Sequence, residues 1–534
     1  MAEIVAHPGV VAAAMMRPRA ALLRASVLLL AIAAVSKLTT VAADSFVAAR
    51  FGLSADTDAY LLAVGLVGAI IAAPGETLRL AVIPLCGKLF RDGRRREAAG
   101  VVLVVLAAAG LLGLLITAAL LGGQTWITSA AAPGLGGDER ETLSRLIWFL
   151  AAVPVLGLVS AVLLGVLHAQ LRFGVPAVAG IGLSAGVIVM GLLFGGTMGV
   201  SSLALGYAAG AFAAVVLLVL AAKRLFAGGI VVAGAGRELR SFLRLALPTG
   251  FAVAIVSAGA VIERAVASAT GSGNVAALGF AIKLITQAGV ISQSIWTPLT
   301  PMLTASGASA GHAGDQRLVI FSVKLVLLIL VPATALLVAL REPLVAVVFE
   351  HGAFTAADTG RTATLLALHS GSLVGEGLFM VAVAALISLH EVGTRVIASL
   401  LFIAAKIALA LSLAPPLGAA GIALAASVSS LLAGAYVMRV LARRLPPAMT
   451  KDLLAFSGKV TVAGLVTLAA AAMLSELVAA WSGSGALAGD LLWLSVGSLG
   501  ALAVYLTALL LLNVEEAHTL LRRARASVAG AWSN

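Results

Sequence analysis

The sequence has little charge and almost no cysteine. Only 11% of its 534 residues are charged, whereas about a quarter are charged in an ordinary soluble domain. Hydrophobic residues make up 61% of the chain, and its mean hydropathy is +1.12. This composition excludes a water-soluble fold. Cys86 is the only cysteine, which excludes an internal disulfide and any metal site built from cysteines.

Motifs for chemistry are also absent. The chain has no G-x-x-x-x-G-K-[ST] phosphate loop, which argues against a built-in ATPase motor, and its seven histidines form no H-E-x-x-H arrangement. Glu350, His351 and Asp358 lie close together in sequence, as the catalytic groups of an enzyme do in space, but Thr355 or Asp358 is better suited to begin the next helix as its cap. We therefore expect no catalytic residues, no metal and no cofactor.

Long apolar runs recur from residue 26 to residue 513 with only short polar breaks. A membrane-spanning helix needs roughly 20 mostly apolar residues. By this criterion the sequence predicts an all-α membrane protein of about fourteen transmembrane helices. The predicted spans are 26–49, 58–85, 99–122, 143–167, 176–198, 201–222, 245–269, 275–300, 318–340, 360–389, 395–413, 417–441, 455–478 and 488–513.

The basic residues are distributed unevenly among the loops. Roughly 23 Lys and Arg fall before the first span, after even-numbered spans and in the C-terminal tail, against roughly 5 in the other loops, so both termini are predicted to be cytoplasmic. The same asymmetry accounts for the net charge of +12. Nucleic acid is therefore not an expected partner.

A weak internal repeat has an offset of roughly 217 to 222 residues, as in many transporters. Pro84 corresponds to Pro301, and the Leu167-His168 pair to Leu389-His390. The repeat covers six helices, so we predict two six-helix lobes around a central cavity, plus two C-terminal helices. The predicted divisions are a cytoplasmic tail (1–25), an N-lobe (26–225), a C-lobe (226–444), and helices 13 and 14 with a cytoplasmic tail (445–534).

Several ionisable residues remain inside or at the edges of the predicted spans. Each costs several kcal/mol if it faces lipid, roughly 2.5–3.5 on insertion scales, so they are expected to face a cavity or one another. Lys37 and Lys283 lie deepest, and we interpret them as cationic contacts for a phosphate or carboxylate. The set comprises Lys37, Asp44, Glu76, Arg79, Glu263, Arg264, Lys283, Lys324, Glu376, Lys406 and Lys459.

The other charges have alternative interpretations. Glu263 and Arg264 are adjacent and point in different directions on a helix, so each is expected to need its own partner. Glu376 lies between two glycines, where it would titrate, coordinate a cation or neutralise a lysine. By contrast, the three lysines near predicted helix ends are expected to extend to the membrane surface. These are Lys324, Lys406 and Lys459.

Three stretches of the sequence carry a family resemblance. The chain closely resembles the lipid II flippase (MurJ/MviN) family of the multidrug/oligosaccharidyl-lipid/polysaccharide exporter superfamily. The resemblance covers most of the chain and agrees with fourteen helices and cytoplasmic termini. The matching residues are 349–359 with Thr362-Ala363 and Thr394-Arg395; 33–36 with Phe51-Gly52 and 57–59; and Leu167 with Arg172-Phe173 and Pro176.

The resemblance implies a function in the bacterial inner membrane. The family flips an undecaprenyl-pyrophosphate-linked peptidoglycan precursor by alternating access, and a cationic cavity grips the pyrophosphate. By position, Lys37 and Lys283 replace arginines of the family, while Asp44 and Asp58 retain acidic positions. The family's other cavity arginines and one acid are absent here, their places being taken by Ala43, Ile71, Ala72 and Ile282.

The substrate-binding residues predicted in this way are Lys37, Asp44, Asp58, Arg264 and Lys283. Cavity or ion-coupling residues are Glu76, Arg79, Glu263 and Glu376. The expected partners are a lipid-linked glycan, membrane lipids and cell-envelope synthesis proteins, and the expected energy source is the membrane potential or a monovalent cation. Three alternatives stay open: a flippase for another polyprenyl-linked saccharide, a cation-coupled exporter of small molecules using Glu263 and Glu376, and a non-transporting scaffold.

Overall fold

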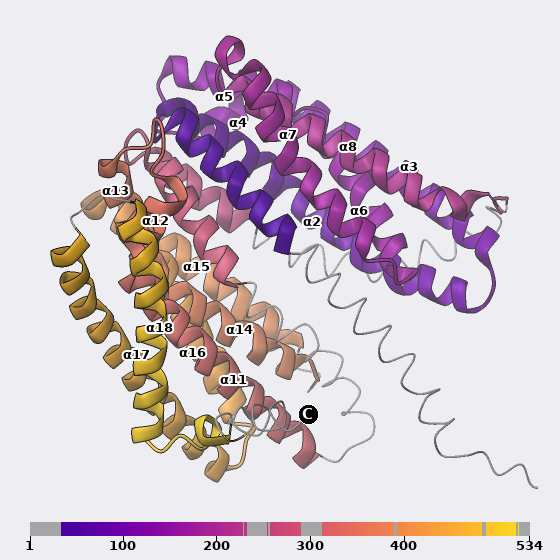
Figure 1. Ribbon diagram of the computed structural model, residues 1–534. Helices are drawn as coiled ribbons and strands as arrows, with labels where there is room; N and C mark the ends of the chain where they lie inside the picture. Colours follow the sequence, from indigo (N-terminus) through magenta and orange to yellow (C-terminus); the bar gives the residue numbers. More distant parts are fainter. Residues whose placement is uncertain are drawn as a thin grey trace, which may run out of the picture. The chain divides into compact units, whose positions relative to one another are not determined.

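A computed structural model describes residues 34–227, 229–231, 254, 257–289, 312–388, 392–482, 487–519 and 522. Throughout these residues the regular structure is helical, with no strands (Figure 1). The all-α prediction is therefore confirmed. A helix satisfies its own backbone hydrogen bonds, which is what a segment surrounded by lipid requires.

Short connections join the labelled helices within α2 to α8 and within α11 to α18. In chain order they are α2 (Ala55–Arg91), α3 (Arg95–Gly122), α4 (Gln124–Ala131), α5 (Gly137–Phe149), α6 (Val153–Ala169), α7 (Gly174–Met198), α8 (Ser201–Phe226), α11 (His312–Ala339), α12 (Arg341–Phe349), α13 (Ala356–His369), α14 (Gly371–Ser388), α15 (Val392–Leu417), α16 (Ala419–Ala442), α17 (Pro447–Ser482) and α18 (Leu487–Leu511). Residues 34–51, 257–268 and 274–289 are also helical.

Ten helices in the described residues are long and apolar enough to cross a membrane, or eleven if α5 and α6, which meet at a 43° bend, form one span. These coincide with eleven of the predicted spans. The remaining predicted spans, 26–49, 245–269 and 275–300, lie partly outside the described residues. The count of about fourteen therefore stays a prediction.

The helix boundaries confirm the internal repeat. Helices α3 to α8 begin 217 to 219 residues before α11 to α16, in the same order. Even the irregular features recur, because the short helix α4 corresponds to α12, and the divided pair α5 and α6 corresponds to α13 and α14. Pro301 and Leu389-His390, which the sequence paired with Pro84 and Leu167-His168, lie outside the described residues.

The chain forms two compact units. Unit 1 comprises 1–46, 63–127 and 143–254, and unit 2 comprises 47–62, 128–142 and 255–534. Two short segments from the N-terminal half, 47–62 and 128–142, therefore belong to unit 2. The predicted division into lobes and C-terminal helices stays a prediction.

In unit 1, helices α7 and α8 pack closely because both carry glycines at four-residue spacing. A Cβ atom on Gly186 would collide with the backbone at Gly206, and one on Gly210 would collide with the carbonyl of Gly182. Small residues at this spacing let the backbones of membrane helices approach each other.

A second group of buried residues joins α2, α3 and α6 and includes Cys86, which is a free thiol as expected.

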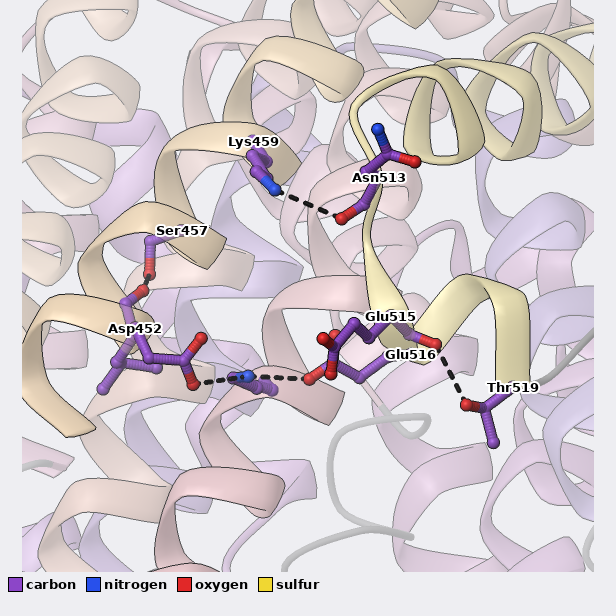
Figure 2. A network of polar contacts seen from close by, with 9 residues as sticks. Asp452, Ser457, Lys459, Asn513, Glu515, Glu516 and Thr519 are labelled. Carbon is purple, nitrogen blue, oxygen red and sulfur yellow. Dashed lines mark hydrogen bonds and ion pairs between the residues drawn. The ribbon is translucent and has the colours of Figure 1, made fainter. Parts of the chain in front are cut away.

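In unit 2, α14 and α15 pack against α16, and the C-terminal pair α17 and α18 packs against α11 (Figure 1). An ion-pair network holds part of this arrangement. The ammonium of Lys324 on α11 lies 2.8 Å from a carboxylate oxygen of Asp452 on α17 and 2.7 Å from one of Glu516, just after α18 (Figure 2). Nearby, Lys459 donates to the backbone carbonyl of Asn513 at 3.1 Å (Figure 2).

Candidate functional site

The Asp58 carboxylate, on the first turn of α2, caps a different helix. Its side chain is 1% exposed and accepts backbone N–H bonds from Gly273 and Ala276, both at 2.6 Å. These N–H groups lie at the start of helix 274–289, where the helix cannot satisfy them itself. A carboxylate at this end is also favoured by the helix dipole. The predicted binding residue Asp58 therefore fixes the helix that carries Lys283.

The surrounding loops are interlocked through their backbones. The N–H of Ala353 donates to the carbonyl of Ala49 at 2.7 Å. Gly52, with φ of +60°, faces the Ala353 carbonyl so closely that a Cβ atom would lie 2.6 Å from its oxygen. The guanidinium of Arg361 donates to the carbonyl of Ser272 at 3.2 Å and to the side-chain oxygen of Asn274 at 3.0 Å. We call residues 49–58, 272–276 and 351–361 the interlocked loops.

The start of α13 lies in these loops and is capped as the sequence predicted. Thr355 is the N-cap residue and forms a capping box with Asp358. The Thr355 backbone N–H donates to the Asp358 carboxylate at 2.9 Å. The capping box gives acceptors to two backbone N–H groups that have no partner within the helix, those of Thr355 and Asp358. The structure gives these polar residues a role in local folding.

Lys283 lies on the capped helix beside a group of aromatic rings. Its ammonium is 5.6 Å from the centre of the Phe280 ring, a cation–π distance. Phe280 is fully buried and packs against Phe349 and Phe354, with ring centres 4.8 and 6.1 Å away. The stem of the half-buried Lys283 is therefore held near a rigid aromatic base.

A second cluster lies inside the membrane-spanning part of unit 2. The Lys406 ammonium is 2.6 Å from a carboxylate oxygen of Glu263, and these side chains are 17% and 6% exposed. Arg264 instead donates to the carbonyl of Ala260 at 3.4 Å. The expectation of separate partners for these neighbours is confirmed. His369 is also buried in this cluster and interacts electrostatically with Glu263 and Lys406.

Glu376 adjoins this cluster. Its charge acts on Lys406 and Glu263, and its side chain is exposed. It makes no hydrogen bond or ion pair with the part of the chain that the structure describes. The two predicted ion-coupling carboxylates of unit 2, Glu263 and Glu376, therefore interact electrostatically.

In unit 1, Glu76 and Arg79 form a two-point ion pair on α2, with N–O distances of 2.9 and 2.5 Å. His168, at the end of α6, interacts electrostatically with both. Lys37 and Asp44 belong to the same unit, Lys37 exposed and Asp44 buried. Because Lys283 belongs to unit 2, the convergence of Lys37 and Lys283 on one cavity stays a prediction.

The prediction that three lysines extend to the membrane surface is wrong for Lys406. Lys406 pairs with Glu263, since α15 continues to Leu417 and places this lysine in the middle of the span rather than near its end. Lys324 is 12% exposed and held between two carboxylates. For Lys406 a counter-ion inside the fold replaces contact with water, whereas the partners of Lys324 are 62% and 26% exposed.

Sequence reasoning missed two residues of these clusters, His369 and Arg361, and it gave Lys406 the wrong environment. A usable signal existed for Lys406, a single charge inside the candidate span Ile397–Leu417. His369 gave a weaker signal as a lone histidine within Ala356–Val383. Arg361 gave none, because its partners lie 87 and 89 residues earlier in the chain.

These features define a class of protein. Polytopic helical proteins with an internal repeat and ionisable groups within their spans are typical of secondary transporters. The family model named "Lipid II flippase MurJ" matches residues 47–489. The chain belongs to the lipid II flippase MurJ family.

Similar sequences and structures agree. A probable lipid II flippase MurJ of Thermotoga maritima is 28% identical over 436 residues, covering 81% of this chain and 87% of the relative. A probable lipid II flippase MurJ of Rhizobium meliloti is 26% identical over 405 residues, covering 72% and 74%.

Among solved structures, a lipid II flippase MurJ in an inward closed conformation matches with a TM-score of 0.73 at 18% identity, covering 90% of this chain and 98% of that one. An inward-facing multidrug resistance MATE family transporter of the MOP superfamily matches with a TM-score of 0.67 at 17% identity, covering 80% and 98%. At these identities the structures show a shared fold.

Proposed function

We propose that this protein carries lipid II, a polyprenyl-pyrophosphate-linked peptidoglycan precursor, across the bacterial inner membrane without covalent chemistry. The observation that carries the proposal is the family-model match over residues 47–489. The named relatives and the similar MurJ structure support it. Alternating access is the mechanism, in which the head group is bound from one side of the membrane and released to the other.

Cationic side chains recognise the pyrophosphate in this mechanism. Lys283 and Lys37 supply ammonium groups, and Arg264 adds a guanidinium. Lysine binds phosphate as a compact point charge, whereas arginine offers a planar fork that makes two hydrogen bonds. Lys283 is the best supported of the three, since Asp58 caps its helix and Phe280 lies beside its ammonium.

Both termini lie in the cytoplasm in this proposal. The interlocked loops then lie at the periplasmic surface, because they connect odd-numbered to even-numbered spans. Membrane lipids surround the spans, and cell-envelope synthesis proteins supply and consume the substrate.

Purified protein in proteoliposomes tests this function. Labelled lipid II is incorporated in one leaflet, and its appearance in the other is timed. We expect Lys283→Ala to slow movement by about tenfold or more, equivalent to roughly 1.4 kcal/mol. Lys283→Arg should restore movement, because the positive charge returns. Lys223→Ala, which changes an exposed lysine at the end of α8, is the matched control and should behave like the wild type.

Other outcomes separate the alternatives. Movement of a different polyprenyl-linked saccharide, with none of lipid II, would replace the substrate and keep the mechanism. Efflux of small molecules that stops when ion gradients are dissipated would support an exporter instead. If no substrate moves, and cells depend on the protein even when Lys37 and Lys283 are replaced by alanine, a scaffold is the better explanation.

A further inference from the structure

Phe280, the ring beside Lys283, belongs to a group of three phenylalanines from separate parts of unit 2. Phe280 lies on helix 274–289, Phe349 ends α12, and Phe354 lies in the interlocked loops. Their ring centres are 4.8, 6.0 and 6.1 Å apart, within the range of about 4.5–7 Å for attractive aromatic pairs. At most 2% of each side chain is exposed, so the Phe280 ring has a fixed position and orientation.

The helix that carries this ring is fixed at its start. The Asp58 carboxylate accepts N–H bonds from Gly273 and Ala276, both at 2.6 Å. Phe280 follows Ala276 by about one helical turn. The helix therefore cannot carry the ring away from the interlocked loops without breaking these bonds.

The geometry of the helix brings Lys283 over the ring. Lys283 lies three residues after Phe280, which places the two side chains on the same face of the helix. A helical side chain leans toward the N-terminus, so that of Lys283 runs back over the ring. Its ammonium is 5.6 Å from the ring centre, inside the limit of about 6 Å for cation–π attraction. Lys283 is half-buried and Phe280 fully buried, so the ring contacts the lysine from the protein interior.

An aromatic ring holds an ammonium without cancelling its charge. The negative face of the ring attracts the cation, but the ring has no net charge. A carboxylate in the same place would compete with a phosphate for the ammonium. A hydrogen bond between ammonium and phosphate is charge-assisted and therefore strong, so the lysine can leave the ring when a phosphate arrives. Because the long lysine stem is already held, less conformational entropy is lost on binding.

We propose that Phe280 is a positioning residue for substrate binding, whose ring holds the Lys283 ammonium ready for the pyrophosphate of lipid II through a cation–π contact. Phe349 and Phe354 keep that ring in place. On binding, the ammonium moves from the ring to a phosphate oxygen, and no covalent bond forms or breaks. The identity of the ligand rests on the proposed function, whereas the contact between ring and ammonium does not.

Graded fluorination of the ring tests this role in the full-length protein. Fluorine atoms withdraw electron density from the ring face and so weaken cation–π attraction, while the shape of the side chain changes little. Phenylalanine analogues with one, two or three fluorine atoms are incorporated at position 280, and lipid II binding to the purified protein is titrated in detergent. We expect the affinity to fall with each fluorine, by about two- to fivefold in total. Equal affinities across the series overturn the proposal.

Two controls separate positioning from packing. The same series at Phe379, whose ring packs against Phe402 with centres 5.9 Å apart, should leave the affinity for lipid II unchanged. In a Lys283→Ala background, fluorination at position 280 should have no further effect on the residual affinity, because no ammonium remains to be held. A loss that persists without the lysine would show that fluorination disturbs packing, and it would overturn the positioning role.

A measurement without substrate tests the contact itself. The rate at which an amine reagent modifies Lys283 is followed by mass spectrometry of the purified protein. Weakening the contact should raise this rate by about two- to fivefold across the series, while Lys223, exposed at the end of α8, reacts at a constant rate. A constant rate for Lys283 also overturns the proposal. If the rate rises but the wild type neither binds nor moves lipid II, the proposed function fails and the contact stands.

Discussion

At the scale of single residues, several charged side chains in this protein act on groups far away in sequence. Asp58 caps a helix that begins more than two hundred residues later, and Lys406 neutralises Glu263 from another span. Such contacts form because apolar surroundings leave a charge few alternatives. Each pair therefore fixes the position of one helix relative to another.

Removing the Asp58 carboxylate should destabilise unit 2. Asp58→Ala leaves the N–H groups of Gly273 and Ala276 without acceptors, and we expect a loss of about 1–3 kcal/mol in stability. Thermal unfolding of detergent-solubilised protein measures the effect. Asp56→Ala, on the exposed side of the same helical turn, is the control. Equal unfolding temperatures for the two variants would contradict the capping role.

Breaking the Glu263–Lys406 pair should cost more than removing both charges. Lys406→Met leaves a buried carboxylate, and loss of one partner of a buried pair typically costs 3–5 kcal/mol. The double variant Glu263→Gln with Lys406→Met should recover much of this loss. A double-mutant cycle based on thermal unfolding measures the coupling. Additive effects would mean that the two side chains do not interact.

At the scale of helices, close packing depends on where glycines lie. Between α7 and α8 the backbones touch at Gly182, Gly186, Gly206 and Gly210, so there is no room for side chains. Elsewhere on the spans many leucines are exposed, as expected for surfaces that face lipid. Lipid tails are as apolar as leucine, so packing these side chains against another helix gives no hydrophobic stabilisation. Helix association here depends on fit between surfaces.

A large side chain at one of these glycines should separate the two helices. Gly186→Leu would place its side chain against the backbone of α8, and we expect a destabilisation of several kcal/mol, or failure to accumulate in the membrane. Gly196→Leu on the same helix points into open space and should be tolerated. The amount of folded protein, measured by fluorescence size-exclusion chromatography, compares them. Similar yields would show that the contact is unimportant.

At the scale of the whole molecule, the proposed orientation can be tested with cysteines. The native Cys86 is buried and should react little. Asp92→Cys lies in the loop between α2 and α3 and should react with a membrane-impermeant maleimide only after the cytoplasmic side is opened. Asp138→Cys, exposed near the start of α5, should react in intact spheroplasts. The reverse pattern would place the termini in the periplasm.

The sequence alone was sufficient for the membrane class, the all-α fold, the repeat and the family. Long apolar runs predict spans because a lipid-embedded helix needs a fixed length, and the six-helix offset follows from comparing residues along the chain. The cap at Thr355 was also predictable, because capping depends on residues three positions apart. All of these features are local or periodic, so they can be read along one dimension.

The tertiary structure alone decided which charges meet. Lys406 was interpreted as a surface lysine, yet it neutralises Glu263. The cap that Asp58 provides to helix 274–289 was not predicted either. The division of α5 from α6 by a bend and the assignment of 47–62 and 128–142 to unit 2 were equally invisible in the sequence. The physical reason is that a charge in apolar surroundings is stabilised by whichever opposite charge or dipole lies nearest in space, and distance along the chain does not determine that neighbour.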